Sequence, residues 1–334
     1  MRKLALYWEK HKSEVKCVLC PNYCIIPDTK HGKCRKRVNI SGELFTENYA
    51  ETISLSLDPM EKKPLYHFCP TEQILSLGAN SCNLTCKFCQ NHSSSQTDCA
   101  TQSILPNELL DLCLQKSIRH VAFTYTEPFT WYEYILECAE LLSGSDISVA
   151  LVTNGYVNIE PLNAILPYIS AMNIDLKAYS ESFYKEVCGG QLQPVLDVIK
   201  HCHDKVHLEI TLLLIETLND DSDKLRRLFS FIKNLDSDIP LHISKYFPRY
   251  EMSIKETSER KLLGVAQMAK EYLNYVYIGN VGFSEFQSTY CSKCGALLVE
   301  RQRFNVKIVS LENGRCKKCD NQILHGRASK QSSQ

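Results

Sequence analysis

The chain has 334 residues, of which 44% are hydrophobic, and its 38 basic and 38 acidic side chains give a formal net charge of zero. This length allows one large domain with small additions, and the charge balance excludes a global field that would attract nucleic acid or an anionic membrane. No apolar signal core follows Met1, and no apolar run is long enough to cross a bilayer. The sequence therefore predicts a cytoplasmic protein, in which seventeen cysteines favour metal binding over disulfides.

Residues 1–70 are predicted to form an N-terminal cysteine-rich metal-binding segment. Four potential thiolate ligands lie close together there: Cys17, Cys20, Cys24 and Cys34. Gly32 permits the tight backbone that a turn between ligands needs. Four thiolates can hold zinc or an iron-sulfur cluster, and the spacing alone leaves both open.

From residue 71 short apolar segments alternate with segments of helical periodicity, which is typical of β/α units around a parallel sheet. We expect strands at 73–77, 118–125, 147–152, 170–176, 206–214 and 241–247, and helices at 106–116 and 129–142. In such folds the functional loops follow the carboxyl ends of the strands. Residues 71–286 are therefore predicted to form an α/β barrel-like domain.

The first of these strands leads into a loop with three cysteines at CxxxCxxC spacing, Cys82, Cys86 and Cys89. Each thiolate can bind one iron of a 4Fe-4S cube, which leaves the fourth iron open for a small molecule with an amine and a carboxylate. The alternatives are a zinc knuckle or three buried free thiols. Zinc sites close with four ligands, usually in CxxC pairs, so the lone triplet favours the cluster.

Polar side chains end or follow several of the predicted strands. The candidates are Thr126, Glu127, Thr153, Asn154, Asp175, Lys177, Glu209 and His242. Alternate residues of a strand share a face, so Asp175 and Lys177 point together, and a buried polar pair favours a polar ligand. The ordinary alternatives are a strand-end ion pair for these two residues and helix capping for Thr126 and Glu127. A lone strand histidine such as His242 is more often structural.

Residues 287–334 are predicted to form a zinc-ribbon-like module followed by a polar, disordered tail from residue 327. Two CxxC pairs supply its ligands, Cys291, Cys294, Cys316 and Cys319. Two such pairs form a tetrahedral thiolate site, and metal binding supplies much of the folding free energy of so small a module. Iron in a rubredoxin-like site is the main alternative to zinc.

These motifs together resemble a known family. The CxxxCxxC loop resembles that of the radical SAM superfamily. The segments CxxCPxxC, DPxEKKPLxHF, CxxxCxxCQN, YTEP and DLK, with the terminal CxxC pairs, resemble the radical SAM member of the AmmeMemoRadiSam system, which is related to glycyl-radical activating enzymes. The resemblance implies a partial (β/α)6 TIM-like barrel. The chain departs from the family in lacking the glycines of the GGE-type segment and the PG turn expected near residues 214–220.

The resemblance also implies roles for individual residues. The three loop cysteines would hold the 4Fe-4S cluster, and the open iron would chelate S-adenosylmethionine (SAM). Phe88 would lie beside the adenine, and Thr126 and Glu127 would receive the ammonium group. The SAM carboxylate would be surrounded by Thr153, Asn154, Asp175 and Lys177, and the barrel lumen would be lined by Glu209 and His242.

The implied activity is reductive cleavage of SAM to methionine and a 5′-deoxyadenosyl radical, which abstracts hydrogen from a substrate that the sequence does not identify. The substrate could be a protein glycine, as for an activase, a small molecule or a tRNA-like partner. The resemblance implies a low-potential donor such as flavodoxin or ferredoxin, and Memo-like and AMMECR-domain partner proteins. From a different class of function, the chain could be a non-catalytic iron-sulfur or zinc scaffold, or a redox sensor.

Overall fold

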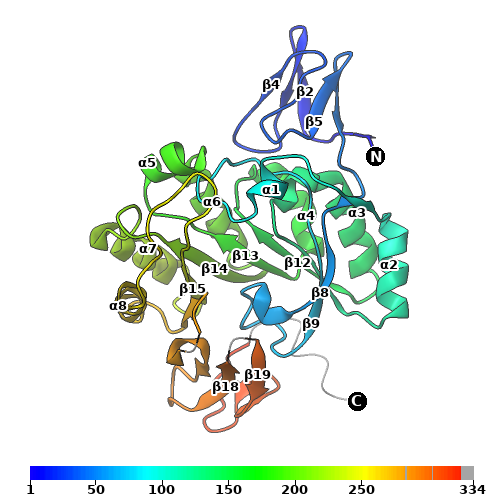
Figure 1. Cartoon of the computed structure of the whole chain (residues 1–334). Helices are drawn as coiled ribbons and strands as arrows, with labels where there is room; N and C mark the ends of the chain where they lie inside the picture. The colour runs from blue at the N-terminus through cyan, green and yellow to red at the C-terminus, as the bar shows by residue number, and fades with distance from the viewer. Residues whose placement is uncertain (283, 303, 325–334) are drawn as a thin grey trace.

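The computed structural model describes residues 1–282, 284–302 and 304–324. A central α/β body carries a small all-β part at each end, built from the first and the last residues of the described chain (Figure 1). The predicted polar tail lies outside the described residues. None of the described helices has the length and apolar character that crossing a membrane requires.

The N-terminal part consists of short antiparallel strands. Their bounds are β1 (Lys3–Leu4), β2 (Trp8–His11), β3 (Glu14–Cys17), β4 (Ile25–Ile26), β5 (Arg37–Ile40) and β6 (Glu43–Thr46). They form two three-stranded sheets, β2-β3-β4 and β1-β6-β5. A further pair, β7 (Glu51–Thr52) with β10 (Gln102–Ser103), joins this part to the segment after the cysteine loop.

The central sheet has the order β16-β15-β14-β13-β12-β11-β9-β8. Its strands are β8 (Leu55–Pro59), β9 (Gln73–Leu77), β11 (His120–Phe123), β12 (Ser148–Thr153), β13 (Ala171–Asp175), β14 (His207–Leu214), β15 (Leu241–Lys245) and β16 (Val276–Gly279). All neighbours are parallel except β8, which is antiparallel to β9. The structure confirms the predicted strands and the α/β class. The sheet is open, with β8 and β16 at its edges, so a closed barrel is not formed.

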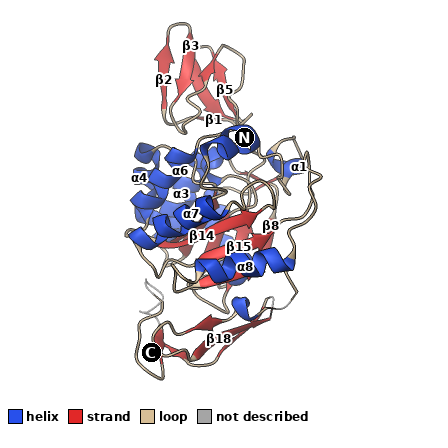
Figure 2. Cartoon of the chain, turned by 90° about the vertical axis from the view of Figure 1, so that its left-hand side faces the viewer, coloured by secondary structure: helices blue, strands red, loops and turns tan. Residues whose placement is uncertain are grey.

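Helices cover the outer face of this sheet, as Figure 2 shows for α3, α4, α6 and α7. The helices are α1 (His92–Ser95), α2 (Pro106–Gln115), α3 (Tyr132–Ser143), α4 (Ile159–Ile165), α5 (Glu181–Phe183), α6 (Leu192–Cys202), α7 (Ser222–Leu235) and α8 (Glu259–Ala269). The short helices are η1 (Met60–Lys62), η2 (Pro128–Trp131), η3 (Leu166–Tyr168), η4 (Tyr184–Cys188) and η5 (Glu285–Gln287). Helical periodicity located α2 and α3 correctly, although η2 forms the start of the second predicted helix.

The inner face of the sheet is covered by residues 60–68 of the same chain. Met60, Leu65 and Phe68 are buried against an alanine row that crosses three neighbouring strands. The row consists of Ala122, Ala150 and Ala171, which are paired in register. Such small side chains leave room for an inserted segment. The structure thus places residues 55–70 with the central body, whereas the sequence assigned them to the N-terminal segment.

The C-terminal part contains β17 (Thr289–Tyr290), β18 (Leu297–Gln302), β19 (Asn305–Ile308), β20 (Leu311–Glu312) and β21 (Arg315–Cys316). Its core includes Leu298 and Val299, which form one buried cluster with Tyr66, Tyr275 and Tyr277 of the central body. The terminal module is therefore packed against the body through an aromatic contact.

Candidate active site and metal centres

The CxxxCxxC loop follows β9 at the carboxyl end of the parallel strands, as predicted. Its backbone is fixed from the opposite side, because Thr85 N–H donates to Cys188 O at 2.9 Å and Lys87 N–H donates to Val187 O at 3.0 Å. Gly189 and Gly190 permit this close approach of the two backbones. A Cβ at Gly189 would lie 2.3 Å from Thr85 Oγ1, and the φ of Gly189 is +70°. The loop and the η4 segment are thus built to fit each other.

Polar donors surround the loop sulfurs. Leu84 N–H lies 3.5 Å from Cys82 Sγ, and Asn154 Nδ2 lies 3.7 Å from the same sulfur. The Ser95 hydroxyl is 3.2 Å from Cys89 Sγ. Burial raises the pKa of the Cys82 thiol well above its usual value, so its thiolate requires a cationic partner. A cluster with cationic irons would supply that partner.

The grouping of the sulfurs separates the loop from a single-ion site. Among the described residues, only the C-terminal cysteines bring three or more ligand atoms within 4.8 Å of one another. Within the described chain the three loop sulfurs form no such group. This arrangement fits thiolates on separate irons of a cube.

Cys188 is a neighbour of this site that the sequence analysis left among scattered cysteines. A hydrogen bond with Cys188 is the main reason why the pKa of Cys86 is raised well above its usual value, with burial second. Cys188 is itself fully buried at the end of η4. No spacing signal marks it, because it is 99 residues from Cys89 in the sequence. The Gly189-Gly190 pair beside it was the available clue to a close backbone approach.

Asp175 and Lys177 lie together beside the cysteine loop, as predicted from their strand positions. Lys177 Nζ is 2.8 Å from Asp175 Oδ2, and the lysine side chain is 11% exposed. Burial would lower the pKa of Lys177, but Asp175 and then Cys86 outweigh it and raise the pKa well above its usual value. Lys177 therefore holds a positive charge next to the cluster ligand.

Glu127 is fully buried and binds groups of its own chain. Its carboxylate accepts hydrogen bonds from Thr153 Oγ1 at 2.7 Å, Asn154 N at 2.8 Å and Phe129 N at 3.1 Å. Burial raises the pKa of Glu127 to about 7. The adjacent Thr126 donates to Ala79 O at 2.6 Å. These contacts cap η2 and connect three strand-end loops, and a role for either side chain at SAM stays a prediction.

The remaining predicted cofactor residues divide between two places. Phe88 is buried in the cysteine loop, with its ring centroid 6.1 Å from that of Phe183. Glu209 and His242 instead meet the inserted segment 60–68. Glu209 accepts hydrogen bonds from the backbone of Tyr66 at 3.0 Å and of His67 at 2.7 Å. A contact of Glu209 and His242 with SAM stays a prediction, and the structure places both residues against the inserted segment.

The network around Glu209 is extensive. His242 Nε2 lies 2.6 Å and His207 Nε2 lies 2.9 Å from its carboxylate. Burial would raise the pKa of Glu209, but these two imidazoles lower it well below its ordinary value. Arg301 of the terminal module donates to Tyr66 O at 2.7 Å beside this network. No sequence pattern marks these contacts, which join the strands, the inserted segment and the terminal module.

A cavity of about 450 Å³ opens near the amino ends of β13 and β14, lined by residues that include Ser170, Val206 and His207. This is the edge of the sheet opposite to the cysteine loop, and no cysteine lines the cavity. It is therefore separate from the candidate active site.

The C-terminal cysteines form a compact site for one metal ion. The Cys291 and Cys319 sulfurs are 3.5 Å apart, and the Cys294 and Cys316 sulfurs are 3.7 Å apart. Tetrahedral zinc with bonds of about 2.3 Å separates its thiolates by roughly 3.8 Å. The geometry fits the predicted zinc-ribbon-like module, and either zinc or iron satisfies it.

Cys316→Ser is expected to release one metal ion per chain from this module. Because the ion holds two loops with little core of their own, we expect β18 and β19 to lose amide protection in hydrogen exchange. The absorbance of the reconstituted central cluster is expected to persist. Cys113→Ser, at a buried cysteine in α2 that is remote from any predicted ligand set, serves as the matched control. Loss of the central absorbance in Cys316→Ser would contradict the separation of the two sites.

With this geometry established, comparison with known proteins identifies the fold family. The family model described as the radical SAM superfamily matches residues 77–229, which include the cysteine loop and β11 to β14. The central body therefore contains a radical SAM superfamily domain. An uncharacterized protein of Methanocaldococcus jannaschii is 38% identical over 332 residues, covering 97% of this chain and 99% of its own.

Solved radical SAM structures are similar in fold. A radical SAM methyltransferase from Sphaerobacter thermophilus is 13% identical with a TM-score of 0.50, over 71% of this chain and 72% of its own. A domain of pyruvate-formate lyase-activating enzyme from Bacteroides vulgatus is 20% identical with a TM-score of 0.42, over 48% of this chain and 98% of its own. A radical SAM domain implies an enzyme that uses a 4Fe-4S cluster and SAM.

Proposed function

We propose that this radical SAM protein cleaves SAM reductively at a 4Fe-4S cluster held by Cys82, Cys86 and Cys89. The observation that supports the proposal is the triad itself, whose CxxxCxxC spacing lies in the loop after β9, at the carboxyl end of the parallel strands. When bound, the cluster and SAM supply a 5′-deoxyadenosyl radical that abstracts hydrogen from the substrate.

The side chains of this chain would position the cofactors. Asn154 donates to Cys82 and fixes the loop through Asn83 Oδ1 at 2.9 Å. Lys177, with its charge beside Cys86, is placed to attract a carboxylate such as that of SAM. Glu127 holds the loops after β11 and β12 together from beneath. Burial of these groups excludes water, which strengthens their electrostatic interactions.

The finer identity proposed here is the radical SAM member of the AmmeMemoRadiSam system, with activase-like chemistry on a substrate still to be found. The motifs CxxCPxxC, DPxEKKPLxHF and YTEP support it. We also propose Memo-like and AMMECR-domain partners, a flavodoxin or ferredoxin donor, and a zinc ion in the terminal module. The seventeen cysteines, all of which are free, are compatible with a reducing cytoplasm.

The test is anaerobic reconstitution with iron and sulfide, followed by dithionite and SAM. We expect 5′-deoxyadenosine and methionine from the wild-type protein, and a loss of at least about a hundredfold in Cys86→Ala because a cluster ligand is missing. Cys99→Ser, an exposed cysteine outside the cysteine sets, should match the wild type. Absence of product from a fully loaded wild-type protein would instead favour the scaffold or redox-sensor function.

A further inference from the structure

Four cysteines of the N-terminal part surround one small cavity. These are Cys17, Cys20, Cys24 and Cys34. The rest of the cavity wall is formed by residues that include Leu19, Ile26, Asn83 and Thr130. All four are free thiols. Gly32 packs close to this site, because a Cβ there would lie 3.6 Å from Cys24 Sγ and 3.1 Å from Ile26 Cδ1. The cavity is thus a cradle built by thiols and apolar side chains.

The N-terminal sulfurs are not gathered around one point as the C-terminal sulfurs are. Within the described chain the C-terminal cysteines meet the 4.8 Å criterion for a shared ion, whereas no three of the N-terminal cysteines do. Single-ion thiolates would lie roughly 3.8 Å apart. Like the central triad, the N-terminal set lies outside this single-ion grouping, and four thiolates can each bind one iron of a cube.

Hydrogen-bond donors surround the N-terminal sulfurs as they do the central ones. Lys33 N–H is 3.4 Å from Cys24 Sγ, and Asn22 Nδ2 is 3.7 Å from Cys20 Sγ. The buried guanidinium of Arg37 lies 3.8 Å from Cys17 Sγ. Such donors, with a buried positive charge, stabilise thiolates and tune the reduction potential of a cluster. We propose that Cys17, Cys20, Cys24 and Cys34 hold a second 4Fe-4S cluster, through which electrons enter the central site.

The two cysteine sites are connected by direct contacts. Ser81 Oγ donates to Cys34 O at 2.8 Å, and Asn22 Nδ2 donates to Asn83 O at 2.8 Å. Ser81 and Asn83 are the two chain neighbours of Cys82, so both contacts lead from the N-terminal site to a central ligand. This proximity favours electron transfer between the sites, because tunnelling weakens steeply with distance.

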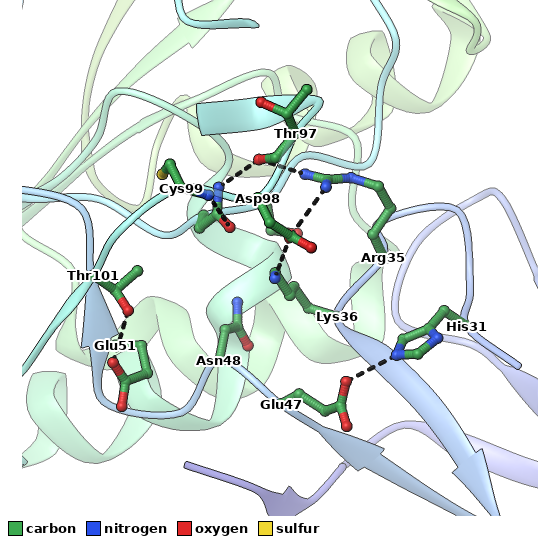
Figure 3. Close-up of polar contacts among 12 residues, drawn as sticks. His31, Arg35, Lys36, Glu47, Asn48, Glu51, Thr97, Asp98, Cys99 and Thr101 are labelled. Carbon is green, nitrogen blue, oxygen red and sulfur yellow. Dashed lines mark hydrogen bonds and ion pairs between the residues drawn. The ribbon is translucent and has the colours of Figure 1, made fainter. Parts of the chain in front are cut away.

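The N-terminal part is also fixed against the segment that follows the central loop. Arg35 Nη1 is 3.3 Å and Lys36 Nζ is 2.7 Å from Asp98 Oδ1, and Arg35 Nη2 is 3.4 Å from Thr97 O (Figure 3). Arg35 Nη2 also donates to Ser95 O at 3.1 Å. The hydroxyl of the same serine contacts Cys89 Sγ. The exposed ion pairs add little energy, but their number fixes one orientation of the two sites.

The charge of residues 1–50 suits a docking site for an acidic electron carrier. Residues 1–50 hold ten Lys and Arg and five Asp and Glu, a formal excess of five positive charges, whereas the whole chain is neutral. Complementary charge accelerates encounter with an anionic partner. One electron from a low-potential, one-electron carrier protein enters at the N-terminal site and leaves to the central site. The N-terminal site returns to its starting state, and no bond is made or broken there.

Metal and sulfide analysis tests the second cluster independently of SAM chemistry. The anaerobically reconstituted full chain is expected to contain about eight iron and about eight sulfide, since each cube holds four of both. The variant Cys82→Ala/Cys86→Ala/Cys89→Ala should retain about half of the iron and show, when reduced, an electron paramagnetic resonance signal that SAM does not alter. About four iron in the wild-type protein, with zinc at the N-terminal cysteines, would overturn the proposal without affecting the proposed function.

The relay role rests on the proposed function, whereas the second cluster does not. Cys20→Ala/Cys24→Ala should keep the SAM-responsive central signal and near-normal SAM cleavage with dithionite, a small reductant. Its cleavage rate with reduced flavodoxin or ferredoxin should fall at least about tenfold, while Cys99→Ser keeps the wild-type rate with both donors. If the double variant and the wild type cleaved SAM at equal rates with the protein donor, the relay would be overturned. If this variant misfolds, stopped-flow reduction of the wild-type protein decides, because a relay requires the SAM-indifferent signal to form before the SAM-responsive one.

Discussion

Glu209→Ala is expected to lower the free energy of unfolding by about 3 to 5 kcal/mol, the range for removing one partner of a buried charged network. The substitution leaves the backbone N–H groups of Tyr66 and His67 without their acceptor, and it removes the carboxylate that binds His207 and His242. Urea unfolding of the reconstituted protein measures the change. Glu271→Gln, at an exposed residue, removes a carboxylate charge as well and should change stability by less than about 0.5 kcal/mol.

The same residue predicts a pH dependence. The pKa of Glu209 is well below its ordinary value in the folded protein, despite burial, because His207 and His242 stabilise the carboxylate. Its contribution is fully present above the pKa of an unfolded glutamate, about 4.3, and is lost as the pH falls towards the folded pKa. The difference in stability between the wild type and Glu209→Ala should therefore shrink below about pH 4.3. A difference that grows on acidification would contradict this assignment.

Local pattern was sufficient for the central strands and for the cysteine loop. β9, β12 and β14 are continuous apolar or alternating runs, and the CxxxCxxC spacing is contained within eight residues. Asp175 and Lys177 were also predicted to be neighbours from strand alternation; β13 ends at Asp175, and their ion pair joins the strand end to the loop that follows. In each case the information lies within one short segment.

The inserted segment 60–68 could not be placed in this way. Its site on the sheet depends on Ala122, Ala150 and Ala171 forming a row, and that row exists only when β11, β12 and β13 pair in their observed register. The sequence instead led to its assignment to the N-terminal segment, residues 1–70. Contacts between distant residues, such as Cys86 with Cys188 or Glu209 with His67, likewise leave no periodic signal.

The second large effect is expected at the ion pair that links the N-terminal part to α3. The guanidinium of Arg37 and the carboxylate of Glu133 are in direct contact, with 1% and 2% of their side chains exposed. Burial would lower the pKa of Arg37, but Glu133, together with the smaller effects of Cys17 and Cys34, outweighs burial and raises the pKa above its usual value. Glu133→Leu therefore leaves a buried, uncompensated arginine charge. We expect it to cost about 3 to 5 kcal/mol in urea unfolding.

The double variant Arg37→Met/Glu133→Leu separates the charge effect from packing. Because replacing both partners of a buried pair by apolar side chains is often close to neutral, we expect it to be more stable than Glu133→Leu by at least about 2 kcal/mol. Lys3→Met/Glu137→Leu is the matched control, since this ion pair also joins the N-terminal part to α3 but is more than one third exposed at both side chains. Its single and double variants should all lie within about 1 kcal/mol of the wild type. If the double variant at Arg37 and Glu133 were no more stable than Glu133→Leu, packing rather than the unpaired charge would account for the loss.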